Sequence, residues 1–166
     1  MKKKDIAIII FLILIIGLSA YLWLAPSGLT TAPQVSFTNL EGKTFKLSDL
    51  KGKPVVVNFW ATTCPGCVVE IPSLVELNQQ YSAKGLTIIG VAMDYDPESQ
   101  VREMVRQKQM NYTIVLDNQS TIARAFGNVS LIPTTFFINK EGKIIRHKLG
   151  EMSHDEFTTM VQGMLL

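Results

Sequence analysis

The stretch NFWATTCPGCVVEIP, residues 58–72, joins the end of an apolar run to two cysteines three residues apart. Residues 55–60, VVVNFW, are β-rich and apolar on both faces except at one asparagine, as in a central strand covered by helices. From 65 to 84 the apolar side chains recur at three- and four-residue spacing, which predicts a helix interrupted by Pro72. Cys64 therefore lies where a buried strand gives way to a helix.

The pair Cys64 and Cys67 has the spacing of a redox couple. Pro65 suits the first helical position, so Cys64 is expected at a helix N-terminus, where the dipole and free amides stabilise a thiolate. That thiolate could attack a disulfide in a partner, and Cys67, one turn further on, could resolve the mixed disulfide. The alternatives are half of a metal site, inert core thiols and a static disulfide. With two cysteines and with His147 and His154 distant in sequence, a zinc site fits poorly.

Length and composition favour one packed domain. The chain has 166 residues, and about 140 remain for folding beyond an atypical N-terminal segment, which suits a single domain. A hydrophobic content of 47% with 18% charged residues excludes a disordered chain. Three N-terminal lysines and Asp5 supply the whole net charge of +2, and the remaining 13 basic and 13 acidic residues indicate no nucleic-acid-binding surface.

Residues 6–24, IAIIIFLILIIGLSAYLWL, predict a membrane anchor. These 19 residues carry no charge, and at ~1.5 Å per residue they span roughly 28 Å, enough for one bilayer crossing. The lysines before this run, with Tyr21 and Trp23 at its end, predict that residues 1–5 are cytoplasmic and that the remainder is exported. A cleaved signal peptide is the alternative. It is disfavoured because the run exceeds a normal signal-peptide core and Leu18 is bulky at the candidate cleavage site.

Beyond the anchor, residues 25–33, APSGLTTAP, predict an extended linker, and the folded domain is expected over 34–166. The domain opens with a β-hairpin around the turn at 39–43. Further expected elements are strands over 86–93, 112–116, 134–138 and 143–147, and helices starting at 97, running from a Ser120 cap to 127, and over 153–165. This alternation predicts an α/β domain whose central sheet has helices on both faces.

The stretch 58–72 resembles the active-site segment of thioredoxin-fold proteins, and it is most similar to that of the membrane-anchored TlpA/ResA type. The match includes LSDLKGK at 47–53, the C-x-x-C-x-x-E-x-P pattern at 64–72 and IPTTFFI at 132–138, and it covers nearly all of 33–166. The strand and helix between 86 and 109 match the insertion that distinguishes this group. The resemblance implies a thioredoxin fold, a central mixed sheet flanked by helices, with an N-terminal β-hairpin, that insertion and one preceding transmembrane helix.

The resemblance assigns roles to four residues. Cys64 becomes the exposed nucleophile and Cys67 the more buried resolving thiol. Pro133 becomes the loop proline that faces the cysteines, with a cis peptide bond to Ile132. The Ile132 backbone is then free to pair with an extended segment of the substrate.

Glu70 is the candidate for proton transfer. It follows Cys67 by three residues, so one helical turn brings its carboxylate near the cysteines, where burial would raise its pKa and allow proton exchange with the resolving thiol. A solvated helix glutamate is the alternative. Asn58 stands where many thioredoxins have a buried aspartate, which leaves Glu70 as the only nearby candidate acceptor apart from water or a partner group.

Thr63 and Trp60 complete the expected substrate groove beside Ile132 and Pro133. Thr63 replaces the tryptophan that thioredoxins carry before the first cysteine, so a large contact surface is lost. Trp60 is retained, and packing under the active-site loop is favoured over direct substrate contact.

The implied function is that of a protein-disulfide oxidoreductase, tethered to a bacterial cytoplasmic membrane and working on its periplasmic or extracytoplasmic side. Its only redox group is the cysteine pair, with no cofactor or metal. The implied substrates are exported cysteine-containing proteins, apocytochromes c among them, and a CcdA/DsbD-type membrane thiol reductant would supply electrons. One alternative is a peroxiredoxin-like peroxidase, although Pro-x-x-x-Thr-x-x-Cys is missing before Cys64. The other is a non-catalytic peptide-binding module.

Overall fold

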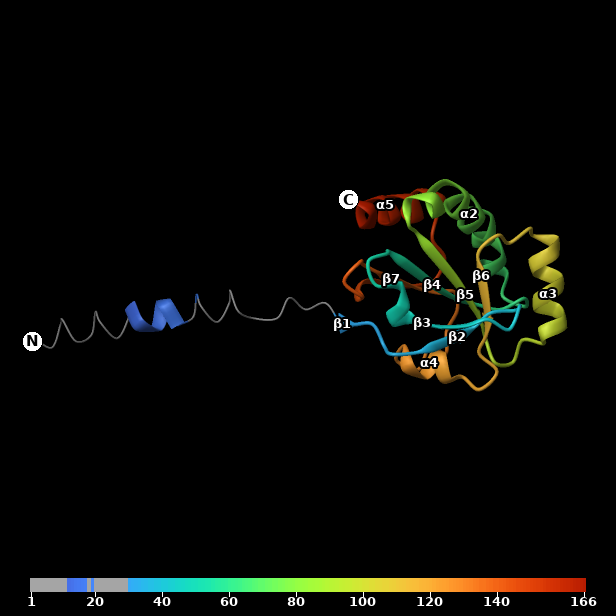
Figure 1. The fold of residues 1–166 in the computed structure, drawn as a ribbon, viewed down its shortest axis with the longest axis horizontal. Helices are drawn as coiled ribbons and strands as arrows, with labels where there is room; N and C mark the ends of the chain where they lie inside the picture. Colours follow the sequence, from blue (N-terminus) through green and yellow to red (C-terminus); the bar gives the residue numbers. More distant parts are fainter. Residues whose placement is uncertain (1–11, 18, 20–29) are drawn as a thin grey trace, which may run out of the picture.

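The structure, a computed structural model, describes residues 12–17, 19 and 30–166 (Figure 1). Residues 12–17 are helical. Within these described ranges, no helix combines the length and the apolar character that crossing a bilayer requires. The membrane anchor predicted over 6–24 lies largely outside the described residues, and so does the cytoplasmic segment predicted before it.

A mixed sheet of six strands forms the centre of the domain, in the order β1-β8-β7-β4-β5-β6. The strands are β1 (Thr30–Thr31), β4 (Val55–Trp60), β5 (Thr87–Ala92), β6 (Thr113–Leu116), β7 (Thr134–Ile138) and β8 (Lys143–Leu149). Strand β4 pairs parallel with β5 and antiparallel with β7. Every residue of β4 is buried, as its uninterrupted apolar run predicts.

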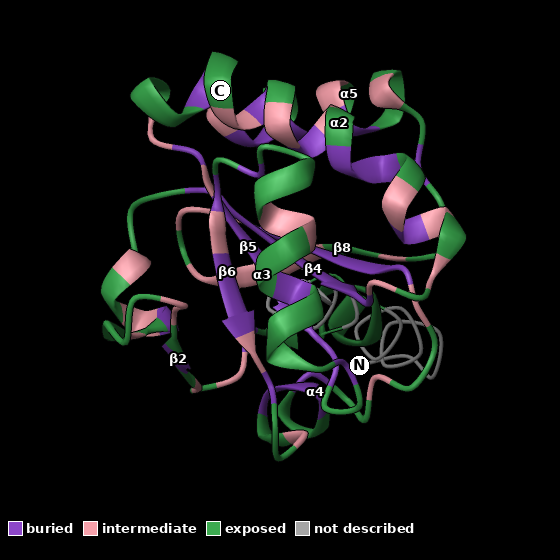
Figure 2. Cartoon of the chain, turned by 90° about the vertical axis from the view of Figure 1, so that its right-hand side faces the viewer, coloured by how far each residue is buried: buried purple, intermediate pink, exposed green. Residues whose placement is uncertain are grey.

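Helices cover both faces of this sheet (Figures 1 and 2). One face packs against α2 (Pro65–Tyr81), α3 (Glu98–Gln107) and α5 (His154–Leu165), and the other against α4 (Thr121–Ala125) and the hairpin of β2 (Ser36–Thr38) and β3 (Thr44–Lys46). Short 3-10 turns, η1 (Leu47–Leu50) and η2 (Ser82–Lys84), precede β4 and β5. Alternate residues of β4 divide between the faces, since Val56 joins the α2 core and Val57 the α4 core. The predicted α/β order and opening hairpin are confirmed.

The folded domain starts earlier than position 34. Thr30 pairs with Ile144 and Thr31 with Lys143 in the antiparallel β1–β8 ladder. The Ala32 amide donates to the Gly142 carbonyl at 2.9 Å, and the Ala32 side chain is buried. The last residues of the linker predicted over 25–33 are therefore part of the sheet, because the edge of β8 offers them a pairing partner.

The helix predicted to break at Pro72 does not break. Helix α2 runs without interruption from Pro65 to Tyr81 and contains Pro72. A proline removes one intrahelical hydrogen bond. Burial of the flanking Ile71 and Leu74 against the sheet keeps the helix in place despite that loss.

The predicted cap at Ser120 is also wrong. Ser120 has a left-handed backbone (φ 53°) and makes no side-chain cap bond to α4. Its hydroxyl donates to Asp94 instead. The cap is Asp117, whose carboxylate accepts hydrogen bonds from the amides of Ile122 at 3.0 Å and Ala123 at 2.7 Å.

Candidate active site

The two cysteines form a disulfide at the start of α2. Strand β4 ends at Trp60 and Cys64 is the N-cap residue of the helix, so the sequence places the first sulfur at the edge of the sheet. The disulfide joins Cys64 to Cys67 with the Cα atoms 5.3 Å apart, and the Cys67 amide donates to Cys64 Sγ at 3.2 Å. Cys64 is half-buried, whereas Cys67 is 2% exposed. Cys64 is thus the more accessible of the two cysteines.

A buried aspartate that the sequence did not single out holds the loop before Cys64. Asp96 accepts hydrogen bonds from the Thr62 amide at 2.6 Å and from the Thr62 hydroxyl at 2.5 Å. Asp96 follows β5, the parallel neighbour of β4, so both loops leave the sheet at the same edge. That shared edge is the one signal from which the sequence could have suggested Asp96.

The proline segment reaches the same edge through β7. Phe59 of β4 pairs with Thr134 of β7, which places the preceding Pro133 at the end of β4 where the cysteine loop begins. The peptide bond between Ile132 and Pro133 is cis, as the family resemblance implies. Pro133 is buried and Ile132 is half-buried, so the structure brings both predicted groove residues to the cysteine edge.

Of the other two predicted groove residues, only Thr63 is accessible. Thr63 is exposed directly before Cys64. Trp60 is 1% exposed, which supports the packing role that the sequence favoured over direct substrate contact. Its indole lies against Gly90 of β5, and Nε1 has no hydrogen-bond partner among the described residues. Trp60 packs beneath the active-site loop because the β4 residues alternate into the core.

Glu70 lies buried one helical turn after Cys67 and is 1% exposed. The Met152 amide donates to Oε1 at 2.5 Å, and the Asn58 amide group donates to Oε2 at 3.4 Å and to the Thr135 hydroxyl at 2.9 Å. Loss of solvation raises the pKa of Glu70 to about 7, although the hydrogen bonds from Met152 and Asn58 to its carboxylate lower that pKa. The solvated alternative does not describe this side chain.

A second carboxylate, that of Glu151, lies at the same place. A Cβ atom on Gly66 would lie 2.8 Å from Glu151 Cδ and 2.9 Å from Cγ, so the carboxylate covers the turn between the cysteines. The charge of Glu151 also raises the pKa of Glu70. In addition to Glu70, which the sequence predicts as the nearby candidate proton acceptor, Glu151 is thus a second carboxylate beside the cysteine turn. The residue comes from the loop after β8, and its approach to α2 depends on strand pairing rather than on any local motif.

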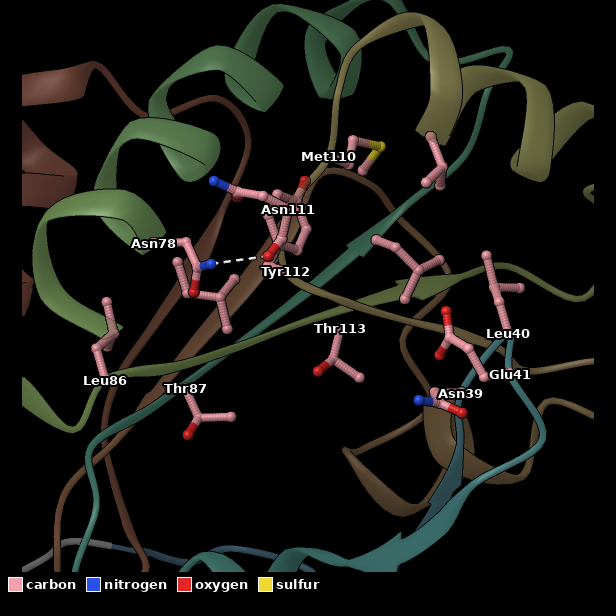
Figure 3. A pocket seen from close by; sticks show the side chains of 13 residues that line it. Asn39, Leu40, Glu41, Asn78, Leu86, Thr87, Met110, Asn111, Tyr112 and Thr113 are labelled. Carbon is pink, nitrogen blue, oxygen red and sulfur yellow. Dashed lines mark hydrogen bonds between the residues drawn. The ribbon is translucent and has the colours of Figure 1, made fainter. Parts of the chain in front are cut away.

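Two other features define what the site contains. Across the part of the chain that the structure describes, no group of three or more His, Cys, Asp or Glu side chains could hold a metal ion. A cavity of about 370 Å³ lies among the hairpin, β6 and α2, and Figure 3 shows Asn78 there donating to the Asn111 carbonyl. Neither cysteine lines this cavity. The disulfide lies at the start of α2, outside the lining of this cavity.

A disulfide at the first turn of a helix, at the end of a central strand and beside a cis-proline, defines a thioredoxin-fold protein-disulfide oxidoreductase. The chain belongs to the Redoxin family, whose model matches residues 28–163, and is a TlpA/ResA-type member of the thioredoxin superfamily. Such enzymes use a redox-active disulfide in place of a cofactor, and here that disulfide joins Cys64 and Cys67.

Individual relatives support this assignment. The chain is similar to a thiol-disulfide oxidoreductase ResA of Bacillus cereus, with 36% identity over 131 residues, 79% of this chain and 75% of the relative. ResA of Bacillus subtilis (strain 168) is 33% identical over 136 residues, 80% of this chain and 75% of the relative. Among solved structures, a thioredoxin-family thiol:disulfide interchange protein from Chlorobium tepidum TLS has a TM-score of 0.78 at 31% identity, covering 86% of this chain and 100% of its own.

Proposed function

We propose that this oxidoreductase reduces disulfides in exported proteins while tethered to a bacterial cytoplasmic membrane by residues 6–24. Residues 1–5 would lie in the cytoplasm and the thioredoxin-like domain on the periplasmic or extracytoplasmic side. The observation that carries the redox role is the asymmetry of the disulfide. The half-buried Cys64 sulfur is open to a partner, whereas Cys67 lies in the core one turn from the buried Glu70.

Reduction begins with the Cys64 thiolate of the dithiol form. The N-terminus of α2 stabilises this negative charge through its free amides, among them the Cys67 amide that donates to Cys64 Sγ. The thiolate attacks one sulfur of the substrate disulfide. A bond forms between Cys64 and that sulfur, and the other substrate sulfur leaves as a thiolate that takes up a proton.

Resolution requires Cys67 to lose its proton. The Glu70 carboxylate, one helical turn away, accepts that proton, and its pKa of about 7 suits transfer near neutral pH. The Cys67 thiolate attacks Cys64 Sγ, the protein disulfide forms, the mixed disulfide bond breaks, and the substrate sulfur that was bonded to Cys64 leaves as a thiolate. Two electrons pass from the protein dithiol to the substrate disulfide, and Glu70 releases its proton when the cycle is complete.

The partners follow from this chemistry and from the family resemblance. The groove at Ile132 and Pro133 would hold an extended cysteine-containing segment of an exported protein, with the Ile132 backbone as its pairing partner. Apocytochromes c are the substrates that the TlpA/ResA resemblance implies. A CcdA/DsbD-type membrane dithiol would return the enzyme to its reduced form.

Trapping of mixed disulfides tests the assignment of the two cysteines. Cys67→Ser should accumulate mixed disulfides through Cys64, because the resolving thiol is missing, and mass spectrometry of the adducts would identify the substrates. Cys64→Ser is the matched control and should trap nothing. Equal trapping by both variants would overturn the roles. Reduction of insulin, without turnover of peroxide in the presence of a thiol donor, distinguishes this activity from a peroxidase.

Two further measurements test direction and topology. Alkylation of thiols in living cells should find the pair mostly reduced, and a mostly oxidised pair would contradict a reductase. A reporter fused after Lys4 should behave as cytoplasmic, and one fused after Leu166 as exported. Processing near residue 20 would contradict the membrane anchor.

A further inference from the structure

We propose that Glu151 is a positioning residue of the redox pair, because its carboxylate covers the turn between the cysteines and its negative charge disfavours the Cys64 thiolate. Glu151 thereby makes the dithiol form a stronger reductant. This inference rests on the role proposed above for Cys64 as the attacking thiol.

Three successive residues of one loop contact three parts of the site. The Gly150 amide donates to the Pro133 carbonyl at 2.9 Å, and Gly150 itself adopts a positive φ of 87° that favours glycine. The Met152 amide donates to Glu70 at 2.5 Å. Glu151, between them, is fixed at both ends of its backbone. The loop after β8 therefore holds the Glu151 side chain against the cysteine turn even though that side chain is exposed.

The contact with Gly66 shows how close this carboxylate comes. A Cβ on Gly66 would lie 2.8 Å from Glu151 Cδ and closer still to Oε1. Because a carbon–carbon bond adds about 1.5 Å, Cδ lies at most about 4.3 Å from the Gly66 Cα atom. Gly66 is the second residue of α2, directly between the two cysteines in the turn. The carboxylate thus occupies space that any other residue at position 66 would fill.

The surrounding charges do not cancel that of Glu151. The Glu70 carboxylate on α2 carries the same negative charge as Glu151, and repulsion from Glu151 raises the pKa of Glu70. Lys148 on β8 is a cation whose charge lowers the pKa of Glu70, and its Nζ atom lies 3.8 Å from the Glu156 carboxylate of α5. Asp96, beyond the other side of the cysteine loop, is a further acid, held by Thr62. A thiolate at Cys64 therefore gains the helix N-terminus as a stabilising feature and meets several carboxylates that oppose it.

The test is Glu151→Gln. Its control is Glu141→Gln, in the exposed turn between β7 and β8, at the end of these strands that lies away from the cysteines. One charge at several ångström across a partly solvated site changes the thiolate fraction about three- to tenfold at a pH where the thiol form dominates. Because nucleophilicity falls as the thiolate becomes more stable, alkylation of Cys64 should accelerate by about two- to fivefold. The control variant should alkylate at the wild-type rate.

A redox equilibrium with a dithiol buffer gives the second readout. Glu151→Gln should favour the dithiol form by about three- to tenfold where Cys64 is ionised, and the gain should vanish at a pH low enough to protonate it. A merely structural role would not produce this pH dependence. Wild-type potentials and alkylation profiles in Glu151→Gln would overturn the inference.

The Glu70→Gln background decides whether Glu151 acts directly on the cysteine turn. The effect of Glu151→Gln should persist there, because the carboxylate covers the turn itself, and its disappearance would show that Glu70 transmits it and would overturn the direct role. Mass spectrometry must also identify the alkylated sulfur. Alkylation at Cys67 in place of Cys64 would overturn the proposed cysteine roles and this inference together, whereas an unchanged profile at Cys64 would overturn the inference alone.

Discussion

Glu70 and Asp117 are two carboxylates buried to nearly the same degree, 1% and 2% exposed, and their surroundings differ. The Asp117 carboxylate accepts three hydrogen bonds, two from the amides of Ile122 and Ala123 in α4 at 3.0 and 2.7 Å and one from the Thr121 hydroxyl at 3.2 Å. Glu70 accepts one short bond from Met152 at 2.5 Å and one long bond from Asn58 at 3.4 Å. Asp117 lies where a helix starts, whereas Glu70 lies one turn from a disulfide.

The difference shows how the hydrogen bonds of a helix-capping acid differ from those of the acid beside the disulfide. Burial disfavours a carboxylate, and donors directed at both oxygens offset that effect. Asp117 caps α4 by accepting hydrogen bonds from two of its amides. The donors of Glu70 offset it only in part, so its pKa stays raised at about 7. An incompletely compensated acid beside a thiol has the property that proton transfer near neutral pH requires.

The largest expected effect is a pH-dependent loss of stability that originates at Glu70. The native protein keeps Glu70 protonated up to about pH 7, whereas the unfolded chain releases that proton near pH 4.5. Between these values the native state binds more protons than the unfolded chain, so the free energy of unfolding falls as pH rises. Above pH 7 it is lower than below pH 4.5 by roughly 3 kcal/mol. Glu70→Gln removes this dependence. Urea unfolding of the oxidised protein across this pH range measures the difference.

The control for that measurement is built into the comparison. Oxidised protein is used because the disulfide keeps both thiols from titrating. The gap between wild type and Glu70→Gln should open as pH rises through 4.5 to 7 and stay constant above it. Parallel stability profiles for the two proteins would mean that the hydrogen bonds of Glu70 fully offset its burial, and the role of Glu70 as a titrating acid would fail.

The next effect concerns the rate of disulfide exchange. Glu70→Gln keeps the size of the side chain and its ability to accept a hydrogen bond but removes the titrating group. Exchange with a model disulfide should slow by about 10- to 100-fold, the lower range of what a positioned acid or base contributes. Stopped-flow measurement over pH should also show that the inflection near pH 7 is lost. A Glu70→Gln rate profile that retains this inflection would assign it to another group.

Local sequence patterns account for most of the fold but for only part of the site. The apolar run of β4 and the spacing in α2 report burial of neighbouring residues, and the short cysteine spacing reports one helical turn. Glu151 and Asp96 reach the cysteine loop from other strands, so only the pairing of β8 with β7 and of β5 with β4 brings them there. Strand β1 was missed because two threonines carry no alternation to detect.

A smaller effect is expected at the structural acid. Asp117→Ala removes the carboxylate that binds the amides of Ile122 and Ala123, and loss of a helix cap costs about 1 to 2 kcal/mol. Stability measured by urea unfolding should fall by that amount. The disulfide-exchange rate should match wild type over the whole pH range, because Asp117 serves α4 and not α2. A changed exchange profile in Asp117→Ala would remove the distinction between the two buried acids.

The smallest effect separates the true cap from the residue that the sequence pattern favoured. Ser120 occupies the cap position by pattern, but its hydroxyl donates to Asp94 near the surface rather than to α4. Ser120→Ala keeps a Cβ atom at the same left-handed backbone (φ 53°), so any strain there is common to both proteins and cancels in the comparison. Only an exposed hydrogen bond is lost, and the free energy of unfolding should change by less than about 0.5 kcal/mol. A loss as large as that of Asp117→Ala, measured in the same urea series, would return the capping role to Ser120.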